Sequence, residues 1–285
     1  MARFETERTF QTGEMPRAVF YVSCRTGITV ETLGQGLLTQ FQGMPFEHIS
    51  LPYTDTLEKA QQVVERINRA AAETGIRPIV FTTLIDPELR RCVARSEGVF
   101  FDFLGRFIGP LSEELGVEPA QAMGLSHGLV DYDRYMARID AVQFAQLNDE
   151  ALRMKDYHEA DLILIGVSRS GKTPTCLYLA LQFGIRAANF TLQLEDLERC
   201  ALPEKLLALR ERLFGVTIDP QRLHQIRSQR KPDSDYASLP QCRRETKLAE
   251  ALFRDHDIPF ANATAVSIEE IATKIMQRCH LERRI

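Results

Sequence analysis

One stretch of this sequence combines residue types and spacing that could bind phosphate. It matches the pattern G-x-x-x-x-G-K-T with the residues Gly166, Val167, Ser168, Arg169, Ser170, Gly171, Lys172 and Thr173. In such a loop the glycines let backbone N–H groups approach a phosphate closely, the lysine supplies positive charge, and the threonine hydroxyl reaches a magnesium ion. We therefore predict that these eight residues bind the phosphates of a nucleotide, with Lys172 as a catalytic residue and Thr173 as a magnesium ligand.

The residues on both sides of this loop predict the elements that would position it. Leu162 to Ile165 form a short apolar run, which is typical of a strand covered on both faces. Pro174 suits the first turn of a helix, where its missing N–H would be unpaired anyway, and the helix then continues to Phe183. A strand, a loop and a helix in this order place helix amides against a bound anion, which argues against a chance match.

Composition and charge exclude several classes of protein. The chain has 285 residues, enough for two domains, and a formal net charge of −4, which argues against binding to nucleic acid or to an anionic membrane. No apolar run approaches the ~20 residues of a membrane-spanning helix, and the N-terminal stretch lacks the apolar core of a signal peptide. The six cysteines include no C-x-x-C pair, which favours reduced thiols over disulfides or zinc. We expect a cytoplasmic protein.

Strand and helix patterns alternate along the chain, which predicts an α/β fold with mostly parallel sheets. Before the loop we expect strands at 19–23, 46–51, 78–84 and 98–103, and helices at 28–41, 56–74, 86–95 and 131–150. After the loop helix we expect strands at 187–190, 216–218 and 258–264, and helices at 203–214, 220–230, 241–255 and from the capping box at 267–270 onwards. We predict a flexible tail at 1–17, an N-terminal α/β domain with a parallel sheet at 18–150, and a P-loop-containing α/β nucleotide-binding domain at 151–285.

The loop pattern by itself leaves the reaction open, since GTPases, motors and kinases all use it. A GTPase is disfavoured because no N-K-x-D tetrapeptide follows. A motor usually has a later apolar strand that ends in an aspartate, and Val216 to Asp219 is a weak match. Val99 to Asp102 fits that chemistry better but lies upstream of the loop, and a core strand is its simpler interpretation. A compact kinase-like enzyme fits the sequence better than a motor.

The loop and its continuation, Gly166 to Asn189, resemble the nucleotide loop of the phosphoenolpyruvate synthase regulatory proteins, which are relatives of the pyruvate, phosphate dikinase regulatory proteins. At Gly171-Lys172 some relatives have Ser-Lys, and the Gly-Lys of this sequence resembles the synthase-directed branch rather than the dikinase branch. The weakest match is the turn Ser23 to Thr26, because many relatives place an aspartate after the serine. The resemblance covers nearly the whole chain and extends through Ile226–Arg230, Ser234–Ala237, Cys242–Glu245, Ser267–Ala272, His127, Asp131, Tyr135, Arg138–Ile139 and Phe144–Ala145.

The resemblance implies a bifunctional enzyme. Such proteins transfer the β-phosphoryl group of ADP to a threonine of phosphoenolpyruvate synthase and inactivate it. They also remove that group by phosphorolysis, in which phosphate attacks the phosphothreonine and pyrophosphate is released. We thus expect ADP, phosphate or pyrophosphate, and Mg²⁺ as ligands, and the synthase as protein partner; a homodimer is a reasonable expectation. Two alternatives stay open, an ATP-dependent small-molecule kinase and a nucleotide-sensing docking regulator without turnover.

Several further residues have two interpretations each. His127, Asp131 and Asp140 are candidates for the base that takes the threonine proton, but a structural role is the commoner one for each of them, for Asp131 as a helix N-cap. Arg169 could hold phosphate bidentately or face solvent. The turn Cys24-Arg25-Thr26-Gly27 could face a phosphate or be a simple turn.

A basic face is predicted on the helix at 220–230 and just beyond it. Arg227, Arg230 and Lys231 share one side of that helix. They form either a solvated surface, which is the commoner case, or a dock for an acidic or phosphorylated surface of the target enzyme.

Overall fold

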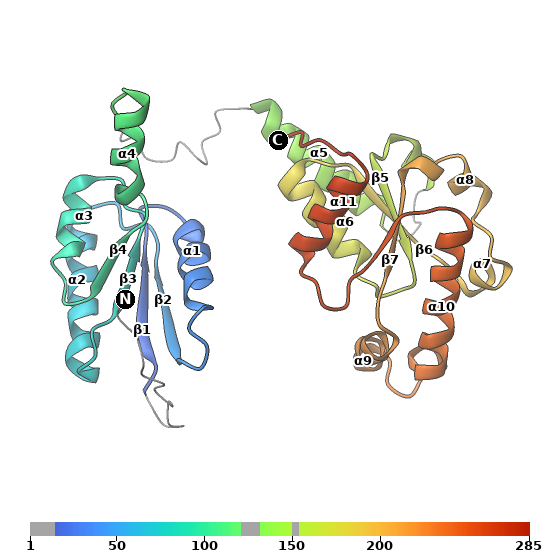
Figure 1. Ribbon diagram of the computed structural model, residues 1–285, viewed down its shortest axis with the longest axis horizontal. Helices are drawn as coiled ribbons and strands as arrows, with labels where there is room; N and C mark the ends of the chain where they lie inside the picture. Colours follow the sequence, from blue (N-terminus) through green and yellow to red (C-terminus); the bar gives the residue numbers. More distant parts are fainter. Residues whose placement is uncertain (1–14, 121–131, 150–153) are drawn as a thin grey trace, which may run out of the picture. The chain divides into compact units, whose positions relative to one another are not determined.

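The computed structural model describes residues 15–120, 132–149 and 154–285 of the chain. The chain divides into two compact units, Met1–Gly128 and Leu129–Ile285, each built around its own parallel sheet (Figure 1). The predicted α/β fold, with one sheet before the phosphate-binding loop and one that contains it, is confirmed. Most of the tail predicted at 1–17 lies outside the described residues. Across the described ranges, no helix is long and apolar enough to cross a membrane.

The first unit alternates strands with helices. Its elements in chain order are β1 (Arg17–Val22), α1 (Ile28–Leu38), β2 (Phe46–Leu51), α2 (Leu57–Thr74), β3 (Ile79–Thr82), α3 (Pro87–Ala94), β4 (Val99–Asp102) and α4 (Gly105–Leu115). The strands pair in parallel in the order β2-β1-β3-β4. Apolar residues of β1 and β3 face both ways, so that α2 and α3 cover one face of the sheet and α1 covers the other (Figure 1).

The second unit carries the phosphate-binding loop between β5 and α6. Its elements are α5 (Tyr132–Leu147), the 3₁₀ helix η1 (Met154–Glu159), β5 (Leu162–Gly166), α6 (Lys172–Phe183), β6 (Ala187–Thr191), α7 (Leu194–Arg199), α8 (Glu204–Leu207), the 3₁₀ helix η2 (Arg210–Arg212), β7 (Leu213–Thr217), α9 (Pro220–Arg230), the 3₁₀ helix η3 (Asp235–Ala237), α10 (Leu239–Asp255), β8 (Phe260–Asn262) and α11 (Ile268–Arg278). Helices α5, α6 and α11 cover one face of the sheet, and α7 to α10 cover the other.

The strand order of the second sheet determines where a ligand binds. The order is β6-β5-β7-β8, with every pair parallel. The chain leaves β5 towards β6 on one side and returns to β7 on the other, so the connections diverge between β5 and β7. Open parallel sheets bind ligands at the carboxyl ends of the strands at such a divergence. The loop after β5 lies at that point.

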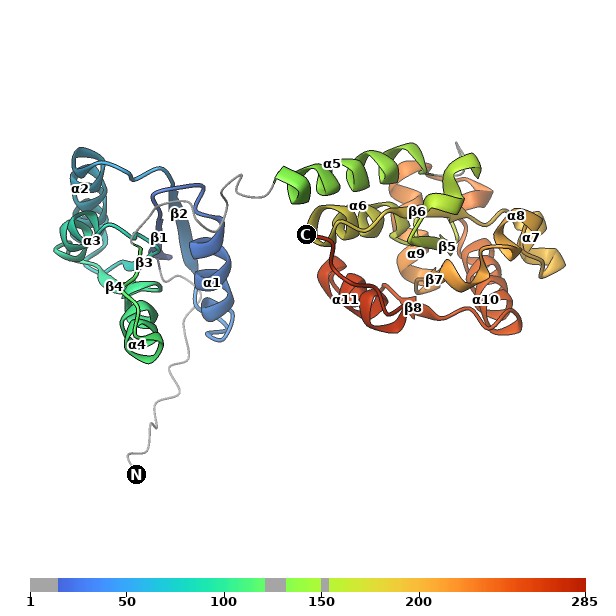
Figure 2. The same cartoon turned by 90° about the horizontal axis from the view of Figure 1, so that it is seen from above.

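Helix α5 corrects the predicted domain boundary. We placed the helix at 131–150 in the N-terminal domain, yet it packs along α6 (Figure 2). Its Ala141 and Ala145 are buried in the core of the second unit. The units therefore divide at 128/129 and not at 150/151. The apolar face of a helix indicates that it is covered but does not indicate by which sheet.

Other differences concern short elements. The helix predicted at 203–214 is replaced by short α8 and η2, and β7 already begins at Leu213. Helices α4 and α7 were not predicted from the sequence. Neither aspartate considered as a magnesium residue lies in such a site: Asp102, in β4 of the first unit, binds Arg90 at 3.2 Å, and the carboxylate of Asp219 caps α9 by accepting from Gln221 N and Arg222 N. Val99 to Asp102 does form a strand, but β4 lies at the edge of the sheet and none of its residues is fully buried, so the core-strand interpretation is only half right.

Candidate functional site

The phosphate-binding loop depends on glycine at two positions for two different reasons. Gly166 ends the fully buried strand β5, and a Cβ atom on it would lie 2.3 Å from the carbonyl oxygen of Val216 on β7. Gly171 is the N-cap of α6 and has a φ of +96°, which side chains disfavour. The first glycine lets two strands approach each other, and the second allows the chain to turn into the helix.

Lys172 is positioned inside the loop. It is only 4 % exposed, and its Nζ donates to the carbonyl oxygen of Val167 at 2.8 Å. The ammonium group therefore crosses the loop instead of extending into solvent. A cavity of about 200 Å³ lies against the first turn of α6, lined by Arg169, Gly171, Lys172, Thr173 and Pro174. Its position at a helix N-terminus beside a lysine suits a phosphate group.

Thr173 belongs to a polar cluster that the sequence analysis did not identify. Its hydroxyl donates to Asp149 Oδ1 at 2.8 Å, and the side-chain amide of Asn189, at β6, donates to the same oxygen. Asp149 follows α5, and that helix is held against α6. No pattern in the sequence around Asp149 indicates this pairing, since the residue lies 24 positions before Thr173.

The oxygen atoms of Thr173 and Asp149 are of the kind that bind a magnesium ion. Magnesium on a phosphate-binding loop takes one or two protein oxygens and completes its shell with phosphate oxygens and water. Thr173 supplies a hydroxyl oxygen and Asp149 a carboxylate at the edge of the phosphate cavity. Among the described residues, no group of three or more His, Cys, Asp or Glu side chains could hold a metal ion.

Arg227 corrects the basic face predicted on α9. Its side chain is 0 % exposed, whereas Arg230 and Lys231 are exposed, so the three do not share one surface. The guanidinium group binds Glu245 Oε2 at 2.6 Å and donates to the carbonyl oxygens of Ser168 and Tyr236 at 3.1 and 3.0 Å. Although burial opposes the charged form, the bond to Glu245 more than offsets it and raises the pKa of Arg227.

The buried ion pair of Arg227 and Glu245 supports the phosphate-binding loop from the side of α9 and α10. Arg227 also lies over the ring of Tyr236, 4.1 Å from its centre, and the Tyr236 hydroxyl is 2.9 Å from Ser168 Oγ. Two groups therefore hold Ser168, one at its carbonyl and one at its side chain. We interpret the charged cluster as a structural support of the loop.

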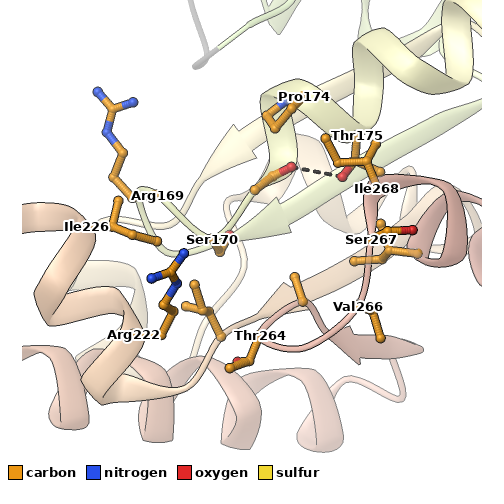
Figure 3. Close-up of a pocket in the computed structure, with 14 residues that line it drawn as sticks. Arg169, Ser170, Pro174, Thr175, Arg222, Ile226, Thr264, Val266, Ser267 and Ile268 are labelled. Atoms are coloured by element: carbon orange, nitrogen blue, oxygen red, sulfur yellow. Dashed lines mark hydrogen bonds between the residues drawn. The ribbon is translucent and has the colours of Figure 1, made fainter. Parts of the chain in front are cut away.

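Two larger cavities flank the loop. One of about 400 Å³ draws its lining from the β6 side and from α9, η3 and α10: Ser168, Thr191, Leu192, Gln193, Leu194, Arg227, Asp235, Tyr236, Gln241 and Glu245. The other, of about 390 Å³, lies on the β8 side and includes residues of the loop, α9 and the start of α11 (Figure 3). Most lining residues of the first cavity are polar, whereas about half of those of the second are apolar.

The remaining candidates have different outcomes. His127 and Asp131 lie outside the described residues, and Asp140 is exposed on α5. Arg169 has a φ of +72° and its side chain points away from the other labelled side chains in Figure 3.

The turn Cys24-Arg25-Thr26-Gly27 belongs to the first unit, where it joins β1 to α1. There the hydroxyl of Ser23 accepts from Arg25 N and from the Thr83 hydroxyl. The simple-turn interpretation accounts for these contacts.

The sequence matches a known protein family and several named relatives. The model of a family described as kinase/pyrophosphorylase matches residues 19–276. A protein of Alkalilimnicola ehrlichii, provisionally named a phosphoenolpyruvate synthase regulatory protein, is 52% identical over 272 residues, which cover 95% of this chain and 99% of the relative. Relatives with the same provisional name in Hahella chejuensis and Legionella pneumophila are 49% and 48% identical over 271 residues, 95% of this chain and 100% of each relative.

Proposed function

This chain belongs to the kinase/pyrophosphorylase family, and from that membership we propose that it is a bifunctional regulator of phosphoenolpyruvate synthase. It phosphorylates a threonine of the synthase with ADP and inactivates it, and it restores the enzyme by phosphate-dependent removal of the group. The observation that carries the proposal is the loop at β5 with the buried Lys172 across it. Such a loop suits a diphosphate, and a diphosphate takes part in both directions.

In the forward direction the threonine oxygen of the target attacks the β-phosphorus of ADP. The bond from that phosphorus to the bridging oxygen breaks, AMP leaves, and the threonine proton passes to a base. Lys172 and the loop amides stabilise the charge on the transferring group and hold it in line with the attacking oxygen. A magnesium ion would neutralise further phosphate charge, held by Thr173 and Asp149, whose mutual bond already orients both oxygens.

In the reverse direction an oxygen of inorganic phosphate attacks the phosphorus of phosphothreonine. The bond to the threonine oxygen breaks, that oxygen takes up a proton, and pyrophosphate leaves. The new diphosphate then occupies the position that the diphosphate of ADP occupied before. Because no nucleoside takes part in this direction, the contacts to the diphosphate at the loop serve it without contacts to a base or ribose.

The test is intact-mass analysis of purified phosphoenolpyruvate synthase incubated with this protein, Mg²⁺ and either ADP or ATP, followed by phosphate. We expect a gain of one phosphoryl group with ADP only, and its loss with pyrophosphate release when phosphate is added. Lys172→Met should abolish both changes, whereas Lys205→Met, at an exposed lysine of α8, should leave them intact. Inhibition of the synthase without any change in mass would refute the enzymatic proposal and favour a docking regulator. No change in mass and no inhibition would favour a small-molecule kinase.

A further inference from the structure

The cavity on the β8 side of the loop continues the phosphate site. Arg169, Gly171 and Pro174 line both this cavity and the smaller one against α6. A ligand whose diphosphate lies on the loop therefore reaches the larger cavity directly. We propose that this cavity binds the base and ribose of the nucleotide, a proposal that rests on the proposed function. The cavity then serves the nucleotide-dependent direction only.

The size and composition of the cavity suit a nucleoside. Its volume is about 390 Å³, within the range of small-molecule sites. Away from the loop its walls are mostly aliphatic, contributed by Ile218, Ile226, Ala263, Val266, Ile268 and Ile271. Ile268 is 39% exposed although it is a large apolar residue. A flat purine ring would cover such side chains and remove their apolar surface from water.

The charged and polar residues of the lining suit the same ligand. Arg222 projects from α9 towards Ser170 in Figure 3, where its planar guanidinium group could stack on a base. Among the described residues that line it are arginines but no aspartate or glutamate, so these residues do not repel a phosphorylated ligand. The other large cavity, on the β6 side of the loop, is lined in contrast by two acidic residues, Asp235 and Glu245.

One hydroxyl group of the lining provides a hydrogen-bond donor to a ring nitrogen. Thr264 Oγ1 accepts from Asp219 N at 2.6 Å, so this oxygen already acts as an acceptor and its proton can be donated to a ligand. The Ser267 hydroxyl, in contrast, bonds Glu270 N and the Glu269 carboxylate. Because purine ring nitrogens are acceptors, Thr264 matches the edge of the base, while the aliphatic residues match its faces.

The test compares calorimetric binding of Mg²⁺–ADP and of Mg²⁺–pyrophosphate to the full-length protein. The variants are Arg222→Ala and Ile268→Ser, at exposed positions where folding tolerates change. Their matched controls are Arg230→Ala, exposed on the same helix, and Ile76→Ser, exposed in the first unit. We expect the two cavity variants to weaken ADP binding by about 5- to 50-fold and to leave pyrophosphate binding within about twofold of the wild type.

The outcomes separate this inference from the proposed function. Loss of ADP affinity with intact pyrophosphate affinity supports the cavity assignment, and it also shows that the variants are folded. Equal losses for both ligands, or an unchanged affinity for ADP, would overturn it while leaving the proposed function in place. Failure of the wild-type protein to bind either ligand would refute the proposed function and the cavity assignment together.

Discussion

Replacement of Arg227 by methionine should destabilise the second unit strongly. The guanidinium group is fully buried and makes hydrogen bonds to Ser168 O, Tyr236 O and Glu245 Oε2. Methionine fills a similar volume but leaves the Glu245 carboxylate, which is 13% exposed, without its cation. Removal of one partner from a buried ion pair costs about 3–5 kcal/mol of stability. This is a large part of the free energy of unfolding of a domain, which is typically about 5–15 kcal/mol.

Urea denaturation followed by circular dichroism measures this change. If the free energy of unfolding falls by about 2 kcal/mol per molar urea, a loss of about 4 kcal/mol of stability lowers the urea midpoint by about 2 M. The control is Arg230→Met, the same substitution at an exposed position of α9, which should shift stability by less than about 0.5 kcal/mol. Hydrogen exchange of peptides from α9 and α10 shows whether the loss lies in the second unit.

The double variant Arg227→Met/Glu245→Met tests the electrostatic reasoning. Replacing a buried pair by apolar residues is often nearly neutral, so we expect the double variant to be more stable than Arg227→Met alone. If the two single effects simply add, the pair is not coupled, and the destabilisation has to be ascribed to lost packing. If Arg227→Met matches Arg230→Met in stability, the support assigned to this residue is wrong.

Three further predictions concern other parts of the molecule. Asp149→Asn should slow phosphoryl transfer by about 10- to 100-fold and raise the Mg²⁺ concentration needed, measured by single-turnover kinetics; an unchanged Mg²⁺ dependence would contradict the assignment. Gly166→Ala should cost about 1–3 kcal/mol because its Cβ would lie 2.3 Å from Val216 O, whereas Gly36→Ala, with open space around it on α1, should not destabilise in thermal melts. Burial, and then the charge of Glu31, raises the pKa of Tyr21 to about 12, so the stability of the first unit should fall as pH rises from about 10 to 12; Tyr21→Phe should remove that fall in urea titrations.

The loop and the α/β fold could be predicted because both are encoded locally. A buried parallel strand is a short apolar run, and the loop consists of consecutive residues whose spacing is set by the phosphate. The alternation of strands and helices then indicates parallel sheets. The separation of the two units was harder to predict, since the amphipathic pattern of α5 is compatible with packing on either sheet.

The contacts that complete the site could not be predicted because they join distant residues. Asp149 reaches Thr173 only because α5 packs along α6, and Arg227 is buried only because α10 brings Glu245 against α9. Helical spacing places Arg227 near Arg230 on one surface, but it does not show which neighbour covers that surface. A charged side chain is rarely buried without a partner, and that partner lies 18 positions further along the chain.

The two sheets share one strand order but not one chemistry, and the residues at their divergence points explain why. Both follow the order second, first, third, fourth strand, so each has a point where connections diverge and a ligand could bind. In the second unit that point carries a loop that begins with Gly166, which leaves backbone amides accessible. In the first unit Ser23 follows β1, and its hydroxyl accepts from the hydroxyl of Thr83, which follows β3. That side-chain bond joins the two strand ends at the first divergence point, whereas at the second point Lys172 lies across the loop and bonds Val167 O.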